Sequence, residues 1–543
     1  MKSLKLTYLI KTILFCISTI CLWSCSNNNP KSLNAIPQNT DMVAAVDVYS
    51  IIKKGKLNEV SSYNFFKTFK KEIRNENKKA SRIMTNIIED PGSTGIDFTE
   101  DLFIYYIDEA KDEQFLCMTI DLNKEDQFAT FLEDVLDKTE LTYDIEKEKT
   151  YKYTILKNEL AIAWDKEKVV FLLAENRSSR VNLDLEIEIL FKLDATKQIM
   201  EKEEFATFYG KKKDLSIWFS PSMFENNYSF KKVVNELDFD ISDNYMSAYL
   251  DFGKDNISLI GEVTPDKDFD KKMKENNFWK KQGNPKLLGY LPNESYANAS
   301  MSIDPVAYYN LMKDEKGFDK IKTKFNKDTG FGVKEFMSSL NGNIVFSLIG
   351  FDQVENTYIS YFGEEKTRKT QVPLMGLTLD MNTDNYIKQL VNEIPEEKLH
   401  KRNDYYEIEL DNTYSAYLAF SDNVCFLTND KNSIRAFKDG GFKTKSLSNS
   451  DHASHLLKSG YYAYMNLDYK DYPSEVKSEI EKKQNRKEEK LFKIWDELAS
   501  SIELKQIDDY SVELNLKTSK RDSNSLSTLI TVLDDNYKDY LGL

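Results

Sequence analysis

Short runs in which apolar and polar residues alternate recur along the chain, and this period of two predicts β-strands. In the first half of the chain the runs lie at residues 42–48, 102–107, 115–122, 151–156, 160–164, 169–173, 215–219, 245–252 and 257–263. Other segments repeat their apolar residues every three or four positions, which predicts amphipathic helices. These segments are residues 65–84, 126–136 and 230–237.

The connections between the predicted strands indicate the fold class. Only Lys157, Asn158 and Glu159 separate two of the strands, and the next connection, at residues 165–168, is equally short. Such connections join antiparallel neighbours, because a parallel pair needs a crossover of a dozen or more residues. Hairpins interleaved with helices predict an α+β fold with a mostly antiparallel sheet and packed helices.

Six segments of the first half have counterparts, in the same order, in the second half. The pairs are residues 36–48 with 291–304, 94–98 with 329–333, 118–123 with 377–382, 153–164 with 406–420, 214–219 with 461–466, and 245–252 with 510–516. Six ordered matches predict an internal duplication, with two tandem homologous halves at residues 31–283 and 286–543. Gly283 and Pro285 interrupt a helical pattern and mark the expected linker, around residues 280–286.

The duplication predicts which residues occupy equivalent places in the two halves. The segment Met118 to Asp121 should overlie Leu377 to Asp380, each a strand that leads into a helix. Cys117 should then lie near Gly376 and Phe171 near Phe426, so that Cys117 and Cys425 occupy non-equivalent sites. Loop lengths are free to differ, because surface insertions cost little free energy.

The N-terminus has the layout of a signal peptide. Lys2, Lys5 and Lys11 precede an apolar run, residues 12–23, which falls short of the roughly 20 residues that a membrane-spanning helix needs. The following LWSC, from Leu22 to Cys25, resembles the lipobox of bacterial lipoproteins, although Trp23 is bulkier than the usual residue.

The lipobox resemblance implies a signal peptide at residues 1–24, cleavage before Cys25, and lipid attachment to the Cys25 thiol. Residues 25–30 would then be the lipidated cysteine and a polar tether, and a membrane would be a partner through the N-terminal lipid. An ordinary signal peptide with an incidental cysteine is the alternative.

Composition and charge narrow the class of protein. The chain has 543 residues, of which 41% are hydrophobic and 30% charged, and this suits a globular protein with more than one domain. Loss of residues 1–24 would remove three lysines and no acid, so the net charge would change from −15 to −18. Nucleic acids and anionic lipid surfaces attract basic patches, so we expect neither as a partner. Cys117 and Cys425 lie in apolar strands, where buried free thiols are the expected state and a disulfide the alternative.

Few residues suggest chemistry. The sequence contains no glycine-rich phosphate loop, paired-cysteine zinc pattern or nucleophile elbow. His452 and His455 would bind zinc only if a third ligand approached, and two exposed histidines on a helix are the plainer interpretation. The third histidine is His400. The acidic run from Asp266 to Asp270 lacks the glycine and the final acid of a calcium loop and better suits the start of a helix.

Two weaker candidates remain. Asp121 and Asp380 stand at matching places, and paired carboxylates perform acid–base chemistry when they are about 5 to 10 Å apart. A helix cap or a turn is the plainer role for both. The 31 Tyr, 32 Phe and 5 Trp include candidates for a sugar-binding groove, although most are expected in the core. We therefore predict no catalytic, cofactor-binding or metal-binding residue, and only Cys25, the lipidation site, as a functional residue.

The lipobox, the Ile36-Pro37 turn, the TGID and MTIDLN motifs and their second-half counterparts resemble a family of Bacteroidota envelope lipoproteins known only as a domain of unknown function. The resemblance covers essentially the whole mature chain and implies a location and an architecture, but no activity. In that phylum an acidic run after the lipidated cysteine often marks surface export, and residues 26–29 (SNNN) have none. An outer-membrane anchor that faces the periplasm is therefore favoured, with surface exposure left open.

Three functions remain open on the sequence alone. The first is a non-enzymatic envelope lipoprotein that binds a protein or assists an envelope assembly. The second is a lipoprotein that binds a glycan or another small molecule in a cleft between the two halves. The third is an enzyme whose site is assembled from dispersed residues, and a buried group of acids with perturbed titration would favour it.

Overall fold

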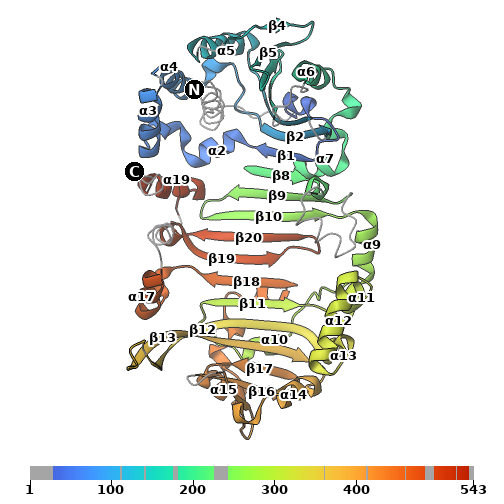
Figure 1. Cartoon of the computed structure of the whole chain (residues 1–543), viewed down its shortest axis with the longest axis vertical. Helices are drawn as coiled ribbons and strands as arrows, with labels where there is room; N and C mark the ends of the chain where they lie inside the picture. Colours follow the sequence, from blue (N-terminus) through green and yellow to red (C-terminus); the bar gives the residue numbers. More distant parts are fainter. Residues whose placement is uncertain are drawn as a thin grey trace. The chain divides into compact units, whose positions relative to one another are not determined.

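The computed structural model describes residues 29–543 except 77, 111–112, 140–141, 175–181, 225–242, 360, 411–413, 459, 484–494, 521 and 537–543. The predicted lipidation site Cys25 and the predicted helix at residues 230–237 lie outside the described residues. Helices and a large antiparallel sheet confirm the α+β class (Figure 1). Among the described residues, no helix has the length and apolar character required to cross a bilayer.

The chain forms two compact units, each of which is described separately. The first unit comprises Met1–Asn226, Ile241–Thr264 and Lys520–Leu543, and the second comprises Asn227–Asp240 and Pro265–Ser519. These units differ from the predicted halves, because the change of unit falls after Thr264 and the end of the chain belongs to the first unit.

The first unit is built on an antiparallel sheet whose described strands run in the order β4-β5-β6-β7-β3-β2-β1-β8-β9-β10. The strands are β1 (Met42–Val46), β2 (Leu102–Ala110), β3 (Glu113–Asp121), β4 (Glu146–Lys147), β5 (Lys152–Leu156), β6 (Leu160–Trp164), β7 (Lys168–Ala174), β8 (Leu215–Phe219), β9 (Tyr245–Phe252) and β10 (Asn256–Thr264). Its helices are η1 (Lys31–Ala35), α2 (Val48–Gly55), η2 (Leu57–Ser62), α3 (Asn64–Glu76), α4 (Lys78–Glu89), η3 (Pro91–Thr94), α5 (Glu125–Thr139), α6 (Leu183–Phe191), η4 (Ala195–Lys197), η5 (Ile199–Glu201), α7 (Glu203–Gly210), η6 (Pro221–Phe224) and α19 (Ser525–Asp535).

The second unit has an antiparallel sheet in the order β14-β15-β16-β17-β13-β12-β11-β18-β19-β20. The strands are β11 (Ala297–Ser302), β12 (Leu340–Ile359), β13 (Glu365–Met381), β14 (Leu399–Lys401), β15 (Tyr406–Glu409), β16 (Ser415–Ser421), β17 (Val424–Thr428), β18 (Tyr461–Asn466), β19 (Ala499–Gln506) and β20 (Ser511–Thr518). Its helices are α9 (Lys267–Glu275), α10 (Pro285–Gly289), α11 (Pro305–Met312), α12 (Lys316–Thr329), α13 (Val333–Ser339), α14 (Asn385–Asn392), η7 (Glu396–Lys398), α15 (Lys431–Lys438), η8 (Lys443–Lys445), η9 (Leu447–Asn449), α16 (Ala453–Lys458), η10 (Tyr469–Asp471) and α17 (Ser474–Lys483).

The strand order of the second unit repeats that of the first when ten is added to each strand number. The register agrees as well, because Thr119 of β3 pairs with Phe103 and Val170, and Thr378 of β13 pairs with Val345 and Phe426. This register places Cys117 at the position of Gly376, as predicted.

Two of the predicted equivalences are wrong in detail. Phe426 occupies the position of Val170, and Phe171 is one residue away, on the opposite face of its strand. The match of residues 245–252 with 510–516 joins β9 to β20, whereas β9 occupies the place of β19. Neighbouring strands in which apolar and polar residues alternate have similar sequence patterns. The match therefore fell on β20, which is the neighbour of β19, the strand at the equivalent place.

The pleat of each sheet divides the core of its unit into two layers. Cys117 and Met118 are neighbours in β3, but Cys117 packs on the layer that contains α6 and α7 and Met118 on the layer that contains α4 and α5. In the second unit Phe426 packs with α15, and Cys425 packs with α14. Cys117 and Cys425 therefore face different layers of their units, as the predicted non-equivalent sites require.

The strands of the first half begin and end close to their predicted bounds, and the predicted helix at residues 65–84 is two helices, α3 and α4. The C-terminal helix α19 packs on α2 within the first unit, where a Cβ added at Gly55 would lie 2.8 Å from Cδ1 of Ile530. Asp534 of α19 accepts a hydrogen bond of 2.8 Å from the backbone N–H of Phe65, at the start of α3. Helix α19 therefore packs in the same unit as α3, which lies some 470 residues earlier in the sequence.

Candidate functional site

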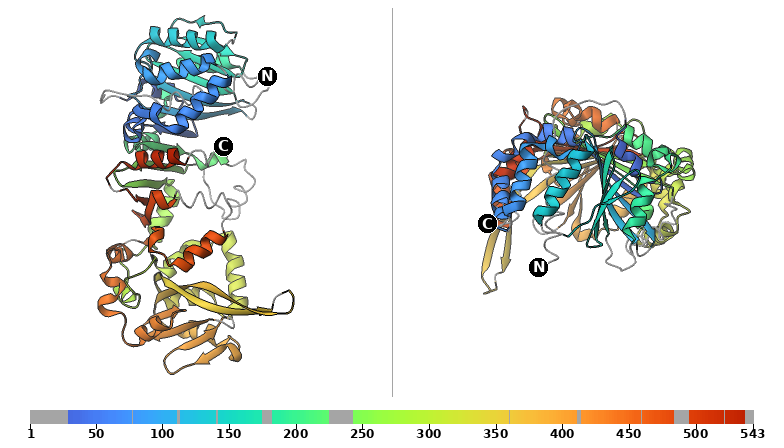
Figure 2. Two further views of the ribbon diagram at one scale, coloured as in Figure 1. Left: turned by 90° about the vertical axis from the view of Figure 1, so that its left-hand side faces the viewer. Right: turned by 90° about the horizontal axis from the view of Figure 1, so that it is seen from above.

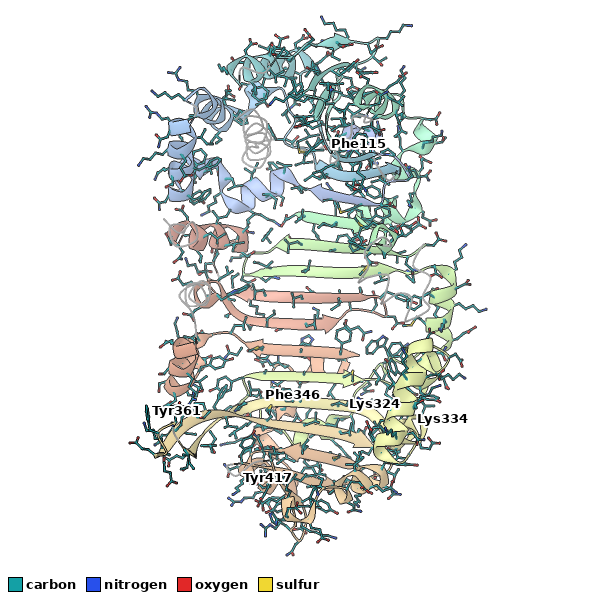
Figure 3. The ribbon with its side chains drawn as sticks, viewed as in Figure 1. Phe115, Lys324, Lys334, Phe346, Tyr361 and Tyr417 are labelled. Carbon is teal, nitrogen blue, oxygen red and sulfur yellow. The ribbon has the colours of Figure 1, made fainter. Side chains whose placement is uncertain are left out.

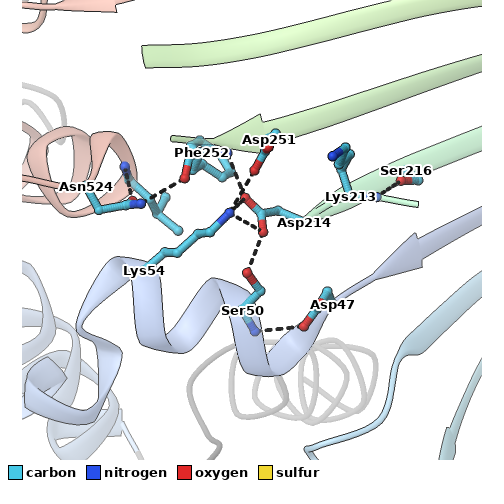
Figure 4. Close-up of polar contacts among 10 residues, drawn as sticks. Asp47, Ser50, Lys54, Lys213, Asp214, Ser216, Asp251, Phe252 and Asn524 are labelled. Atoms are coloured by element: carbon cyan, nitrogen blue, oxygen red, sulfur yellow. Dashed lines mark hydrogen bonds and ion pairs between the residues drawn. The ribbon is translucent and has the colours of Figure 1, made fainter. Parts of the chain in front are cut away.

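A cluster of polar side chains in the first unit, which we call the Asp214 clasp, joins α2 to β8 and β9 (Figure 4). Asp214, whose side chain is only 4% exposed, lies just before β8, and its carboxylate is bonded to Nζ of Lys54 at 2.6 and 2.8 Å. Ser50 donates its hydroxyl to Asp214 at 2.5 Å, and the backbone N–H of Phe252 donates at 2.7 Å. Lys54 also reaches Asp251 at 2.7 Å.

The helix α2 positions two members of the clasp. Asp47 caps this helix by accepting the N–H of Ser50 at 2.7 Å, and Ser50 and Lys54 then lie one helical turn apart on the same face. Burial lowers the pKa of Lys54, but its bonds to Asp214 and Asp251 outweigh this effect, so the pKa is raised above its ordinary value. The contacts of Asp214 tie α2 to the start of β8 and the end of β9, which is the geometry of a structural clamp.

Asp121, one of the two aspartates singled out in the sequence, holds the beginning of the described chain. Its carboxylate accepts the backbone N–H groups of Lys31 and Ser32 at 2.8 and 2.7 Å, which are the first two residues of η1. Burial raises the pKa of Asp121, although these bonds favour the charged form. The predicted role as cap or turn residue for the following helix is thus wrong, because Asp121 caps a segment about 90 residues away.

An acidic group surrounds Asp121. Burial, followed by the charges of Asp121, Asp97 and Asp101, raises the pKa of Glu100 from its ordinary 4.5 to about 7. Asp101 is buried, accepts the hydroxyl of Tyr209 at 2.6 Å, and pairs with Lys212. The raised pKa of Glu100 is the perturbed titration that the enzyme hypothesis requires. The carboxylate of Asp101, however, is already bonded to Tyr209 and Lys212.

Asp380 occupies the equivalent strand position in the second unit and has different partners. It accepts the side-chain amides of Asn341 and Asn343 at 2.7 and 2.9 Å. Each aspartate is thus satisfied by hydrogen bonds within its own unit. Catalysis by this pair has no support.

The three histidines have ordinary protein partners. His452 bonds the hydroxyl of Tyr462 at 2.9 Å and stacks on Tyr464, and burial lowers the pKa of His452. His455 is exposed and stacks on Tyr462, while His400 pairs with a glutamate on the neighbouring strand. The expectation of two exposed helix histidines was therefore wrong for His452, which precedes the helix and is half-buried.

The remaining candidates also have structural roles. Asp266 accepts the N–H groups of Asp268 and Phe269, both at 2.8 Å, and so caps α9 as expected. Cys117 and Cys425 are buried free thiols, and burial raises the pKa of Cys425 to about 12. Among the described residues, no three His, Cys, Asp or Glu side chains form a group able to hold a metal ion. The buried aromatics include Trp164 and Trp218, which agrees with a largely structural use of aromatic residues.

The first unit also contains an open surface pocket of about 450 Å³ between α4, η3 and α5. Its lining residues are Ile83, Ile87, Ser93, Asp126, Gln127, Thr130, Phe131 and Asp134. Apolar side chains face acidic and hydroxyl groups there, a combination that suits a small amphipathic ligand.

Sequence reasoning missed the Asp214 clasp and the acidic group around Glu100. The clasp residues are spread over about 200 positions and share no motif, so only the pairing of β8 with β1 brings them together. The segment DFTED, at residues 97–101, was the single local signal for the acidic group, and it lies directly after the TGI turn.

No curated protein matches this chain. A solved structure titled "Structure of crystal form I of TP0453" is similar over 45% of this chain and 82% of that chain, with 11% sequence identity and a TM-score of 0.25, a likeness too distant to carry an argument. The model of the family described as Domain of unknown function (DUF4836) matches residues 33–526, and the chain therefore belongs to this family.

Proposed function

We propose that this chain is a lipid-anchored envelope protein of the Bacteroidota type that acts by binding a protein or assisting an envelope assembly, without catalysis. The supporting observation is that the polar clusters are occupied by contacts that hold the fold. Asp214 clamps a helix to two strands, Asp121 holds η1, and Asp380 holds two asparagines. Their charges are used inside each unit and are not directed at a substrate.

The proposed anchor is a lipid on Cys25, in the outer membrane and facing the periplasm. Pro30 is buried, and the amides of Lys31 and Ser32 are held by Asp121. Only residues 26–29 separate Cys25 from this docked segment, and four residues span at most about 14 Å. The anchor would therefore hold the Asp121 end of β3 close to the membrane surface.

The anchor is tested by Cys25→Ser, with Cys21→Ser as the matched control in the signal peptide. Cys25→Ser should lose incorporation of labelled fatty acid and move to the aqueous phase on detergent phase separation, whereas Cys21→Ser should retain both properties. A Cys25→Ser protein that still incorporates fatty acid would contradict the lipoprotein proposal.

The binding role is tested by crosslinking the lipidated protein in its native envelope and capturing it under denaturing conditions. The proposal predicts one or a few protein adducts that appear at stoichiometric level and compete with added unlabelled mature protein. Recovery of only glycan or lipid adducts, or of none that compete, would contradict it.

The surface pocket between α4 and α5 favours a second candidate function, the binding of a glycan or another small molecule by the first unit. A bound ligand stabilises the folded state by mass action, so a matching ligand should raise the melting temperature. Phe131→Ala should abolish that shift, and Phe420→Ala, a half-buried residue of the second unit, should not. The acidic group around Glu100 is the observation that favours a third candidate, an enzyme.

We also propose that the two sequence halves arose by duplication. The support is the repeated strand order and the matching register of Thr119 and Thr378 with their neighbours. Independent origins would have to reproduce ten strand positions in the same order, including the insertion of β11 between β12 and β18.

A further inference from the structure

The strands β12 and β13 continue beyond the sheet of the second unit as a projecting hairpin (Figure 2). β11 pairs with β12 only as far as Leu348, and β17 pairs with β13 only as far as Gly376. From Gly350 to Ile359, β12 pairs with β13 alone, and the irregular register between Leu348 and Gly350 marks the point of departure. At about 3.4 Å per residue, this finger extends some 30 Å.

The fold does not require this length. In the first unit, only two residues separate the equivalent strands β2 and β3, with 12 positions from Tyr105 to Cys117. The corresponding residues of the second unit, Ser347 and Gly376, are 29 positions apart. Because the same strand pair needs only a two-residue connection elsewhere in the chain, the extra segment has a purpose other than closing the sheet.

The tip of the finger carries the most exposed apolar side chains of the described protein. Ile359, Tyr361 and Phe362 are 77%, 98% and 83% exposed, whereas every other large hydrophobic residue described is at most 56% exposed. Tyr361 stands at the extreme end of the hairpin (Figure 3), and its ring meets that of Phe362 edge to face at 5.7 Å. Three such side chains in one place are unfavourable in water and point to an apolar partner.

The charges near the tip are largely balanced within the finger. Lys366 pairs with Glu364 at 3.4 Å, and Lys369 pairs with Glu355 at 3.2 Å. The backbone groups of the two strands pair with each other down to Ile359 and Glu365. A narrow convex tip with balanced charge and a phenol beside two apolar side chains suits the interfacial region of a bilayer, where aromatic rings are favoured.

We propose that the tip of the β12–β13 hairpin inserts Ile359, Tyr361 and Phe362 into the surface of a lipid membrane. The balanced charge favours a zwitterionic surface over an anionic one, in agreement with the net charge of −15 of the chain. The insertion is shallow, because the outer edges of the two strands keep unpaired backbone groups that need water. This contact is separate from the Cys25 lipid, and the test is made without the lipid.

The test uses the chain from residue 26 to residue 543, purified without lipid, and vesicles of phosphatidylcholine and phosphatidylethanolamine. The protein should float with the vesicles, and Tyr361→Ser combined with Phe362→Ser should lower its partition coefficient about tenfold or more. Ile321→Ser, an exposed apolar residue of α12 in the same unit, is the matched control and should leave partition unchanged. All variants should keep the melting temperature of the parent.

A second measurement locates the contact. In Phe362→Trp, vesicles should shift the added tryptophan emission to shorter wavelength, and brominated acyl chains should quench it. Three results would overturn the proposal: no binding to vesicles, equal binding by the tip and control variants, or an emission at position 362 that vesicles leave unchanged. Self-association that the tip variant abolishes, without vesicle binding, would also overturn it and assign the tip to a second copy.

Discussion

Glu100 makes the first unit less stable as the pH rises, and removing its charge should reverse this effect. Below pH 4.5 the carboxyl is protonated in the folded and the unfolded state. Between pH 4.5 and about 7 only the folded state binds the proton, so the free energy of unfolding falls as pH rises through this window. Above pH 7 the folded protein carries a charge beside Asp121, Asp97 and Asp101.

Glu100→Gln keeps the shape of the side chain and removes the charge. A pKa rise from 4.5 to about 7 corresponds to at most about 3.4 kcal/mol. Glu100 is only half-buried, so solvent screening reduces the expected gain in stability at pH 8 to about 1 kcal/mol. At pH 5 the gain should be about a quarter of the pH 8 value, because the wild-type folded state is still protonated there.

Urea unfolding followed by tryptophan fluorescence measures this difference, since Trp164 and Trp218 are both buried in the first unit. Glu72→Gln, which removes an exposed acid from α3, is the control and should change stability little at either pH. A Glu100→Gln variant that gains the same stability at pH 5 and pH 8, or loses stability at pH 8, would refute the raised pKa of Glu100, which burial and the acidic neighbours cause.

Three further predictions concern the contacts that hold the units together internally. Asp121→Ala should lower the free energy of unfolding by about 2 kcal/mol and speed hydrogen exchange of the η1 amides. Asp380→Ala should leave those amides protected, and equal exchange rates in the two variants would contradict the role of Asp121. Asp214→Ala should lower the free energy of unfolding by about 3 kcal/mol or more, because it leaves the half-buried Lys54 amine with Asp251 alone and takes the acceptor from the Phe252 amide. Lys54→Met should cost less in the same urea titration, and the opposite order would count against the clasp. Ending the chain at residue 520 removes α19 and should make the first unit the earlier target of limited proteolysis, because the apolar face of α2 loses its cover; an unchanged cleavage pattern would show that α19 is dispensable.

The fold class and the strands of the first half were predictable from local pattern. Runs such as Leu160–Trp164 are apolar and bounded by short turns, so their conformation follows from nearby residues. The β12–β13 finger was not predictable in this way, because its outer part alternates polar residues and buries almost nothing. Its importance appears only when the exposed fractions of Tyr361 and its neighbours are known.

The roles of the candidate residues depended on contacts distant in sequence. Asp121 and Asp380 match in sequence and strand position, but one faces η1 and the other faces two asparagines. The Asp214 clasp shows the same divergence, since the register places Gly460 at the position of Asp214 in the second unit. A Cβ there would lie 1.9 Å from Gln506 and 2.7 Å from Trp279, so no aspartate fits. Strand geometry was retained while the polar contacts were replaced.

One reason why the compact units differ from the sequence halves is the unit in which the last helix of each half packs. β10 is followed by α9 and β20 by α19, yet α9 belongs to the second unit and α19 to the first. Each sequence half therefore supplies a helix to the unit built mainly by the other half. If the halves arose by duplication, a single ancestral copy received this helix from a second copy, as in a symmetric dimer that exchanges a segment. If two such copies were fused into one chain, the helix that was exchanged between two chains would be exchanged between the two units of one chain. Neither residues 31–283 nor residues 286–543 then contain all the elements of one compact unit, and a cut at the predicted linker removes α19 from the first unit and α9 from the second.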